Sequence, residues 1–276
     1  MSKVRSLVGS MLPEQARYVL WQRVGPRLGL GEALGHRVPV PIDLRVLDII
    51  RNGDRVALAD PAVLEMQVLP MLGFNEDLAE IFPSHLNPHL GLGVRSSQYP
   101  SQFSRYLNFL RGYPIGSYLE IGVQHGGTFL ITVEYLRRFH ELPRAVAMDM
   151  FDVPALHAYD GGRFDATLLK MDSRSRKAKR HIDDLGPFDL VLVDGDHAEA
   201  GCRADFELVR GAANMVAFHD IVGSNTPGVR QVWSDVRADF ADEYDFVEFV
   251  DQYDEVRDRT DASFLGIGLA VRKEFR

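Results

Sequence analysis

The sequence predicts an α/β fold built on a doubly wound, mostly parallel, seven-stranded sheet. Short apolar runs alternate with amphipathic helical segments from residue 117 to residue 218, and this alternation is typical of parallel sheets with helices on both faces. Two of the runs end in clusters of acids and histidines, and the carboxyl ends of such strands are where open α/β sheets bind ligands. The last two strand patterns are not separated by a recognisable helix, which predicts a reversed final strand in an antiparallel hairpin at the sheet edge.

The composition is that of an ordinary globular protein. The chain has 276 residues, of which 46% are hydrophobic and 25% charged, enough for one large domain and an elaboration. A net charge of −8 without basic blocks disfavours nucleic acid and anionic membranes as partners. Cys202 has no cysteine partner, and no apolar run approaches the ~20 residues of a membrane span. With no clear secretory signal, a cytoplasmic protein is expected.

Residues 1–97 differ in texture from the rest and are expected to form a helical or irregular elaboration. Asp60 and Asn75 are expected N-caps within it, and residues 84–97 are expected to be a loop. The sequence leaves open whether this part is a cap over the pocket, a dimer arm or a packing appendage; a homodimer is the expected assembly. Helices are expected at Pro13–Val24, Leu44–Ile50, Pro61–Leu69 and Glu76–Phe82.

Residues 98–276 are expected to form the sheet domain, which begins with a helix at Pro100–Leu110. Strands are assigned to apolar runs bounded by Gly, Pro or Asp, and helices to longer amphipathic segments. The expected strands are Ser117–Val123, Ala145–Asp149, Ala166–Met171, Asp189–Val193, Met215–Phe218, Phe246–Val250 and Phe264–Arg272. The expected helices are Thr128–Phe139, Ser175–Leu185, Ala198–Val209 and Val229–Phe240, and the expected long loops are Met150–Phe164 and Asp251–Asp261.

A glycine-rich loop, EIGVQHGG, follows the first strand and opens a helix. Glycines let the backbone turn sharply and approach a ligand closely, and the helix N-terminus offers free N–H groups. Glu120 at the strand end disfavours a pyrophosphate in the loop but suits a ligand that carries an ammonium group. The loop residues expected to contact the ligand are Glu120, Gly122, Gln124, Gly126 and Gly127.

The next two strand ends indicate a nucleoside. Asp149 is placed to accept hydrogen bonds from both ribose hydroxyls, and Asp172 with Ser173 can contact the base ring. Tyr99, before the first helix of the domain, is a further candidate that closes over the ligand, although a packing role is an equal alternative. A cationic nucleoside without phosphates fits these features, and S-adenosylmethionine is such a molecule.

Polar side chains also follow two later strands. Asp194, Asp196 and His197 come after one strand, and His219 and Asp220 come after the next. Because the carboxyl ends of parallel strands lie at one edge of a sheet, these side chains are expected to converge. The alternative for Asp194 and Asp196 is a capping role at the following helix.

Three motifs in this order resemble a known family. YLEIGVQHGG resembles the first motif of class I S-adenosylmethionine-dependent methyltransferases, and FLGIGLAVRK is similar to their reversed final strand. VDGDH, followed by AFHD and PGVRQVW, resembles the metal-dependent O-methyltransferases that modify sugars of antibiotics and polysaccharides. The resemblance covers about residues 98–272. It implies methylation of a sugar hydroxyl, with the reducing-end hydroxyl of a methylated mannoside as the narrowest candidate.

The resemblance also implies roles for the strand-end residues. It makes Asp194 and Asp220 metal ligands, while His219 stands where the family has an acid. Oxygen ligands favour Mg²⁺, and a ligating His219 would favour Mn²⁺ as the second choice. His197 is the first candidate for the general base because imidazole titrates near neutrality, and Asp196 is the alternative.

Other functions fit parts of the same pattern. Asp194-Gly195-Asp196 is also a DxD sequence, as in metal-dependent glycosyltransferases, but Glu120 argues against a diphosphate nearby. A non-catalytic S-adenosylmethionine-binding protein is a third possibility, and the base and metal cluster argues against it. His157, Tyr159 and Arg163 in the loop after Asp149 are either sugar contacts or mobile loop residues.

Overall fold

The computed structural model describes residues 42–159 and 166–275. Residues Ile42–Arg276 belong to one compact unit. The helix expected at Pro13–Val24 and the expected sugar contact Arg163 lie outside the described residues. The division near residue 97 stays a prediction, although buried residues of 42–97 share one hydrophobic core with the sheet. Among the described helices, none is long and apolar enough to cross a membrane.

The described residues form one sheet of seven strands in the order β3-β2-β1-β4-β5-β7-β6. The first five strands of this order pair in parallel, whereas β7 runs antiparallel to both β5 and β6. This confirms the predicted fold, including the reversed last strand. The strands are β1 Ser117–Ile121, β2 Arg144–Asp149, β3 Thr167–Lys170, β4 Phe188–Val193, β5 Ala213–His219, β6 Tyr244–Phe249 and β7 Ile267–Arg272.

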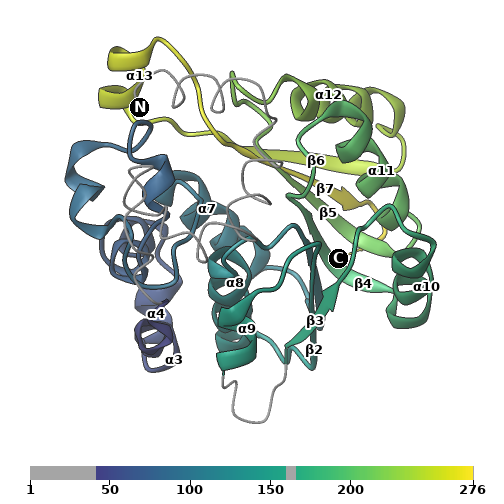
Figure 1. The fold of residues 1–276 in the computed structure, drawn as a ribbon, viewed down its shortest axis with the longest axis horizontal. Coiled ribbons are helices and arrows are strands. Elements are labelled where there is room, and N and C mark those ends of the chain that lie inside the picture. The colour runs from purple at the N-terminus through teal and green to yellow at the C-terminus, as the bar shows by residue number, and fades with distance from the viewer. Residues whose placement is uncertain (1–41, 160–165, 276) are drawn as a thin grey trace, which may run out of the picture. The chain divides into compact units, whose positions relative to one another are not determined.

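Helices cover both faces of the sheet (Figure 1). One face packs against α7 and α8, which contribute Phe103 and Phe129 to the core on that side. The other face packs against α10, α11 and α12, which contribute Ile182, Phe206 and Trp233. The bounds are α7 Pro100–Leu110, α8 Gly127–Phe139, α10 Arg176–Leu185, α11 Glu199–Val209 and α12 Pro227–Asp239.

The part before α7 consists of short helical turns, and both predicted N-caps are confirmed. Asp60 accepts a hydrogen bond from the backbone N–H of Ala62 at 2.8 Å, and Asn75 accepts one from Asp77 at 3.1 Å. The turns are η2 Leu44–Leu47, α3 Asp48–Arg51, α4 Arg55–Leu58, α5 Pro61–Val63, the π-helical η3 Leu64–Val68, α6 Leu69–Leu72, η4 Glu76–Leu78 and η5 Ser84–His89.

Three segments expected to be loops contain short helices, and one expected helix is shorter. Helix η4 ends at Leu78 rather than Phe82, and η5 forms within residues 84–97. Helix α9 (Pro154–Ala158) forms within the expected loop Met150–Phe164, and α13 (Asp254–Thr260) forms within the expected loop Asp251–Asp261. Helix α13 carries acids in its first turn and arginines in its last, which suits the helix dipole. It buries only Val256, so it produces no apolar periodicity that a sequence could reveal.

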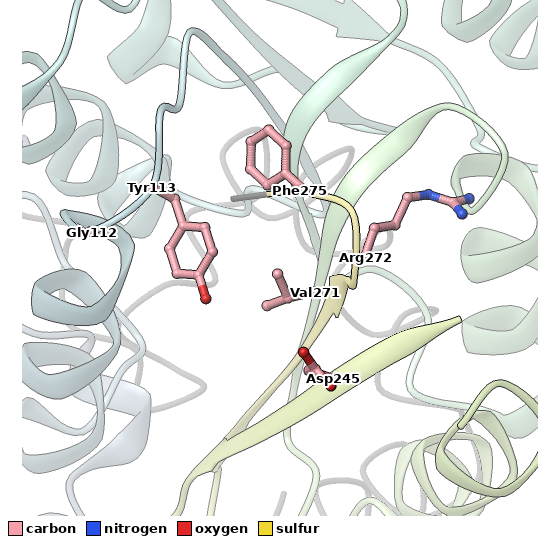
Figure 2. A pocket seen from close by; sticks show the side chains of 6 residues that line it. All are labelled: Gly112, Tyr113, Asp245, Val271, Arg272 and Phe275. Atoms are coloured by element: carbon pink, nitrogen blue, oxygen red, sulfur yellow. The ribbon is translucent and has the colours of Figure 1, made fainter. Parts of the chain in front are cut away.

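The amino ends of the strands are held together by Asp189. Its carboxylate accepts hydrogen bonds from Gly116 N at 2.8 Å, Ser117 Oγ at 3.0 Å and Asn214 Nδ2 at 3.1 Å. A pocket of about 390 Å³ lies at the same end of the sheet, lined by Gly112, Tyr113, Asp245, Val271, Arg272 and Phe275 (Figure 2). This pocket is therefore at the opposite end of the strands from the acids and histidines that the sequence singled out.

Candidate active site

The register of the sheet places Glu120, Asp194 and His219 on one face. Glu120 lies beside Leu192 of β4, which lies beside Ala217 of β5. Side chains alternate along a strand, so Asp194 and His219, two residues further on, point to the same side. Asp194 continues the pairing, because its N–H donates to Ile121 O at 2.9 Å. This is the face covered by α7 and α8.

The strand-end residues converge as predicted. His219 Nδ1 lies 3.0 Å from Asp194 Oδ1 and 3.8 Å from Asp220 Oδ2. His197 lies between the same two carboxylates, with Nε2 3.3 Å from Asp194 and Nδ1 3.3 Å from Asp220. The side chain of His197 is 43% exposed, whereas those of His219 and Asp220 are only 4% and 8% exposed. One accessible imidazole thus stands at the entrance to a buried cluster.

The charges in this cluster compensate one another. Burial raises the pKa of Asp194, but the two histidines outweigh burial and lower it to about 2. Burial lowers the pKa of His219, but the charges of Asp194 and Asp220 outweigh it and raise the pKa to about 9. Burial lowers the pKa of His197, but its hydrogen bond to Asp194 and the charges of Asp194 and Asp220 together outweigh burial and raise it. The carboxylates therefore attract positive charge, which the imidazoles supply in this geometry.

The cluster has the donor set of a divalent-cation site. Asp194, His219 and Asp220 offer ligand atoms that all lie within 4.8 Å of one another. His219 Nε2 is buried and has no hydrogen-bond partner among the described residues. Two carboxylates and one imidazole suit Mg²⁺ or Mn²⁺, and the nitrogen favours the softer ion. These residues fit the metal that the sequence predicts.

Glu120 is buried one row deeper than Asp194 and is 1% exposed. Tyr118 donates a hydrogen bond to its carboxylate. Burial raises the pKa of Glu120 well above its usual value, and the charge of Asp194 adds to this effect. A buried carboxyl group of this kind is stabilised in its charged form by a nearby cation, and the role of Glu120 beside an ammonium group stays a prediction.

The glycine loop lies directly against the turn that carries Asp194. Gly122 has a φ of +85°, and a Cβ on it would lie 2.2 Å from the carbonyl oxygen of Asp194. Gly127 is packed as closely, because its Cβ would lie 2.3 Å from Val94 O. Gly126 adopts a φ of +87° before α8, a backbone conformation that favours glycine. These glycines therefore have packing roles, and their ligand contacts stay a prediction.

Residues before α7 support the same loop from outside. Gln124 Oε1 accepts a hydrogen bond from Ser97 Oγ at 3.1 Å and one from Asn75 Nδ2 at 3.4 Å. Ser96 Oγ lies 3.4 Å from Thr128 Oγ1 in the first turn of α8. The segment before α7, which the family resemblance does not cover, thus contacts the predicted cofactor loop and holds it in place.

Asp149 ties the glycine loop to the end of β2. Its Oδ2 accepts hydrogen bonds from Val123 N and Gln124 N, both at 3.0 Å, and its Oδ1 accepts one from Phe151 N at 2.8 Å. Burial raises its pKa despite these bonds. Its predicted contact with ribose stays a prediction and would use the remaining lone pairs of the carboxylate. Asp172 is more exposed and forms an ion pair with Arg174 at 3.1 Å.

Several other candidate residues have partners within the chain. Tyr99 is fully buried, and its hydroxyl donates to Ile81 O, so this side chain packs rather than facing an open site. Asp196 Oδ1 accepts from Ala198 N at 3.0 Å just before α11, but Ala198 is itself the N-cap and α11 has no side-chain cap, so the capping alternative is wrong. Tyr159 donates to Glu134 at 2.6 Å, and His157 lies 2.9 Å from Asp152.

Asp205 is a polar residue at the site that the sequence reading missed. It is 1% exposed and lies on α11, beneath the turn of residues 194–196. A signal for it exists in the sequence, because Cys202, Phe206 and Val209 form an apolar stripe at helical spacing. Asp205 interrupts this stripe, and an acid at such a position indicates a buried charge.

Part of the sheet domain is similar to a known family. Residues 119–221 match a family model described as a methyltransferase domain, which spans β1 to the end of β5 and confirms the predicted enzyme class. No curated protein matches the chain.

Solved structures with a similar fold include the O-methyltransferase from Bacillus cereus in complex with SAH, with 13% identity, 90% of this chain and 97% of that chain covered, and a TM-score of 0.48. The putative O-methyltransferase from Klebsiella pneumoniae has 17% identity, with 92% of this chain and 99% of that chain covered and a TM-score of 0.41. The MycE methyltransferase of the mycinamycin biosynthetic pathway, in complex with Mg and SAH, has 18% identity, with 62% of this chain and 49% of that chain covered and a TM-score of 0.42. The chain therefore matches only about half of the length of MycE.

Proposed function

We propose that the methyltransferase domain of this chain uses S-adenosylmethionine and a divalent metal ion to methylate a hydroxyl group of a sugar. The observation that carries the proposal is the contact between Gly122 and the Asp194 turn, where a Cβ would lie 2.2 Å from the Asp194 carbonyl oxygen. A methyl donor held by the glycine loop and a hydroxyl held beside the carboxylates would meet at this contact. Holding two reactants in line supplies much of the rate in such a transfer.

The donor side has the charge pattern that S-adenosylmethionine needs. Glu120 is a buried carboxyl group with a strongly raised pKa, so a cationic ligand beside it would be stabilised as the group ionises. The N–H groups of Val123 and Gln124 already donate to Asp149, which keeps the acid at the mouth of the loop. The anionic diphosphate of a nucleotide-sugar would gain no such stabilisation beside Glu120 and Asp149.

The acceptor side needs a group that removes a proton. The hydroxyl oxygen forms a bond to the methyl carbon, the bond from this carbon to sulfur breaks, and the electron pair stays on sulfur. A divalent ion held by Asp194, His219 and Asp220 would lower the pKa of the hydroxyl. His197 is the best-placed base, because it is accessible and lies 3.3 Å from both carboxylates. A divalent ion on the same carboxylates would weaken their attraction for a proton on His197, which would leave the imidazole neutral and able to take the hydroxyl proton.

The sugar acceptor rests on the resemblance of VDGDH, AFHD and PGVRQVW to sugar O-methyltransferases. A homodimer in the cytoplasm and a role in polysaccharide biosynthesis likewise remain predictions. Within the sugars, a methylated mannoside with a free reducing-end hydroxyl is the narrowest candidate. A glycosyltransferase reading of Asp194-Gly195-Asp196 is less favoured, because Asp196 is engaged by Ala198 N at 3.0 Å.

The test is methyl transfer from labelled S-adenosylmethionine to a panel of saccharides that includes methylated mannosides. We expect label in a saccharide with Mg²⁺ or Mn²⁺ present and loss of transfer after chelation, and NMR of the product names the hydroxyl. Full activity with a chelator would overturn the metal role. Thermal stabilisation by nucleotide-sugars but not by S-adenosylmethionine would overturn the methyl donor.

Glu120→Gln is expected to weaken the binding of S-adenosylmethionine by about tenfold or more, because a hydrogen bond to a charged group contributes about 1.5–3 kcal/mol. The amide cannot ionise beside the ammonium group of the donor. Calorimetric titration measures the change, and Glu141→Gln, an exposed glutamate beyond α8, is the control. Binding by Glu120→Gln as tight as that of the unmodified chain would remove Glu120 from the donor site.

A further inference from the structure

Asp205 is a buried acid with no role in the transfer chemistry described above. It is 1% exposed, and its Oδ1 has no hydrogen-bond partner among the described residues. Burial raises its pKa to about 6. A buried carboxyl group with an unsatisfied oxygen is costly, and a native chain keeps such a group for a reason. Its neighbours on the same face of α11, Cys202 and Phe206, are part of the hydrophobic core, so packing alone would favour an apolar residue.

The carboxylate of Asp205 lies directly under the turn formed by residues 194–196. A Cβ on Gly195 would lie 2.9 Å from Asp205 Oδ2, so the backbone of this turn rests on the carboxylate. The backbone of Asp196 and the side chain of Ser173 both lower the pKa of this carboxylate in part, so both lie close to it. Asp205 thus connects the turn after β4 with the turn after β3.

The same two turns are also linked on their outer side. Arg174 forms ion pairs with Asp172 at 3.1 Å and with Asp196 at 3.4 Å. Arg174 is about half exposed, so its ion pairs are screened by water and contribute little. The link through Asp205 is buried, and it is the one that can hold the backbone in a single position.

We propose that Asp205 is a positioning residue that fixes the turn of residues 194–196 and, through it, the carboxylate of Asp194 for a divalent cation. Asp194 follows β4 and does not lie in a helix. Gly195 makes the turn flexible, and the carboxylate of Asp205 beneath the turn restricts this flexibility. Groups that orient metal ligands from behind typically change metal affinity by about 10–100-fold when they are removed. This inference rests on the metal site of the proposed function.

The test measures metal binding without methyl transfer, by following free Mn²⁺ with electron paramagnetic resonance during titration of the full chain. Asp205→Ala is expected to weaken Mn²⁺ binding by about tenfold and to leave S-adenosylmethionine binding within about threefold. Asp205→Asn should recover most of the Mn²⁺ affinity, because the amide keeps the shape of the side chain and one oxygen acceptor beneath the turn. Glu207→Gln is the matched control, since Glu207 lies on the same helix, is half exposed and pairs with Arg210.

The outcomes separate this inference from the proposed function. Unchanged Mn²⁺ affinity in Asp205→Ala, with normal affinity in the unmodified chain, would overturn the positioning role alone. Equal losses of Mn²⁺ and S-adenosylmethionine affinity in Asp205→Ala, or failure of Asp205→Asn to recover Mn²⁺ binding, would also overturn it. An unmodified chain that binds no Mn²⁺ would overturn the metal site itself and the inference with it. Thermal melts of all variants show whether Asp205→Ala folds. If it does not, Asp205→Leu, an apolar side chain among the core residues Cys202 and Phe206, carries the test with the same expected loss of Mn²⁺ affinity, and unchanged affinity in that variant would overturn the positioning role.

Discussion

Asp194→Asn and Asp220→Asn are each expected to slow methyl transfer by about 1,000-fold, since metal activation of an oxygen supplies several kcal/mol. The two carboxylates provide the negative charge of the cluster, and their ligand atoms lie with that of His219 within 4.8 Å. An amide at either position keeps the shape of the side chain but removes its charge. The remaining carboxylate would then be paired with two imidazoles, and the attraction for a divalent cation would fall steeply.

The measurement pairs turnover with two binding constants. The turnover number is expected to fall, Mn²⁺ binding to weaken, and S-adenosylmethionine binding to stay within about threefold, because neither carboxylate belongs to the glycine loop. Asp183→Asn, an exposed acid of α10 paired with Lys179, is the control for loss of an aspartate. Loss of S-adenosylmethionine binding would move the affected acid to the donor side. Retained turnover would show that the acid does not act in the reaction.

The fold and the convergence of the site residues can be predicted from the sequence, because both depend on short patterns of neighbouring residues. Runs such as Asp189–Val193 are short, apolar and bounded by turn residues, and a parallel sheet brings the carboxyl ends of all such runs together. Asp194, His197, His219 and Asp220 could therefore be placed near one another without coordinates. Gly122 could be assigned to a sharp turn for the same reason, since its position after a strand is visible in the chain.

The remaining features depend on contacts between distant residues. Tyr99 was a candidate for closing over the ligand, but its direction is set by Ile81 and the aromatic rings of Phe82 and Tyr253. The raised pKa of Glu120 comes from its burial, which depends on side chains far away in the sequence. Asp205 had a local signal in its apolar stripe, but only the sheet reveals that it lies beneath Gly195.

The donor and metal halves of the site are one mechanical unit, because β1 and β4 are adjacent and their terminal loops touch. Asp149 anchors the glycine loop through Val123 N and Gln124 N, and Asp205 lies under the neighbouring turn. An atom inserted between the two loops would therefore push both of them, whereas loosening one turn from its far side need not move the other. Gly122 is the point of contact between them, so it is where this coupling can be tested.

Gly122→Ala is expected to destabilise the chain by about 3 kcal/mol or more, because strain at a positive φ and an overpacked contact each cost about 1–3 kcal/mol. The φ of Gly122 is +85°, and the added Cβ would lie 2.2 Å from Asp194 O and 2.5 Å from Gly195 Cα, both backbone atoms. For a chain of this size, the melting temperature should fall by about 6–12 °C. Affinities for S-adenosylmethionine and Mn²⁺ should fall together, since both loops must move apart.

Gly211→Ala is the matched control for the loss of a glycine. Its Cβ would have no atom within 4 Å, and its backbone is not in the left-handed region, so the change should be neutral or stabilise by about 0.4–1 kcal/mol through the unfolded chain. Thermal unfolding and the two titrations compare the variants directly. If Gly122→Ala had the same melting temperature as Gly211→Ala and bound both ligands normally, the glycine loop and the turn of residues 194–196 would not be in contact in solution. If Gly122→Ala weakened S-adenosylmethionine binding but left Mn²⁺ binding intact, the two halves would bind their ligands independently, and the shared contact could not align them for transfer.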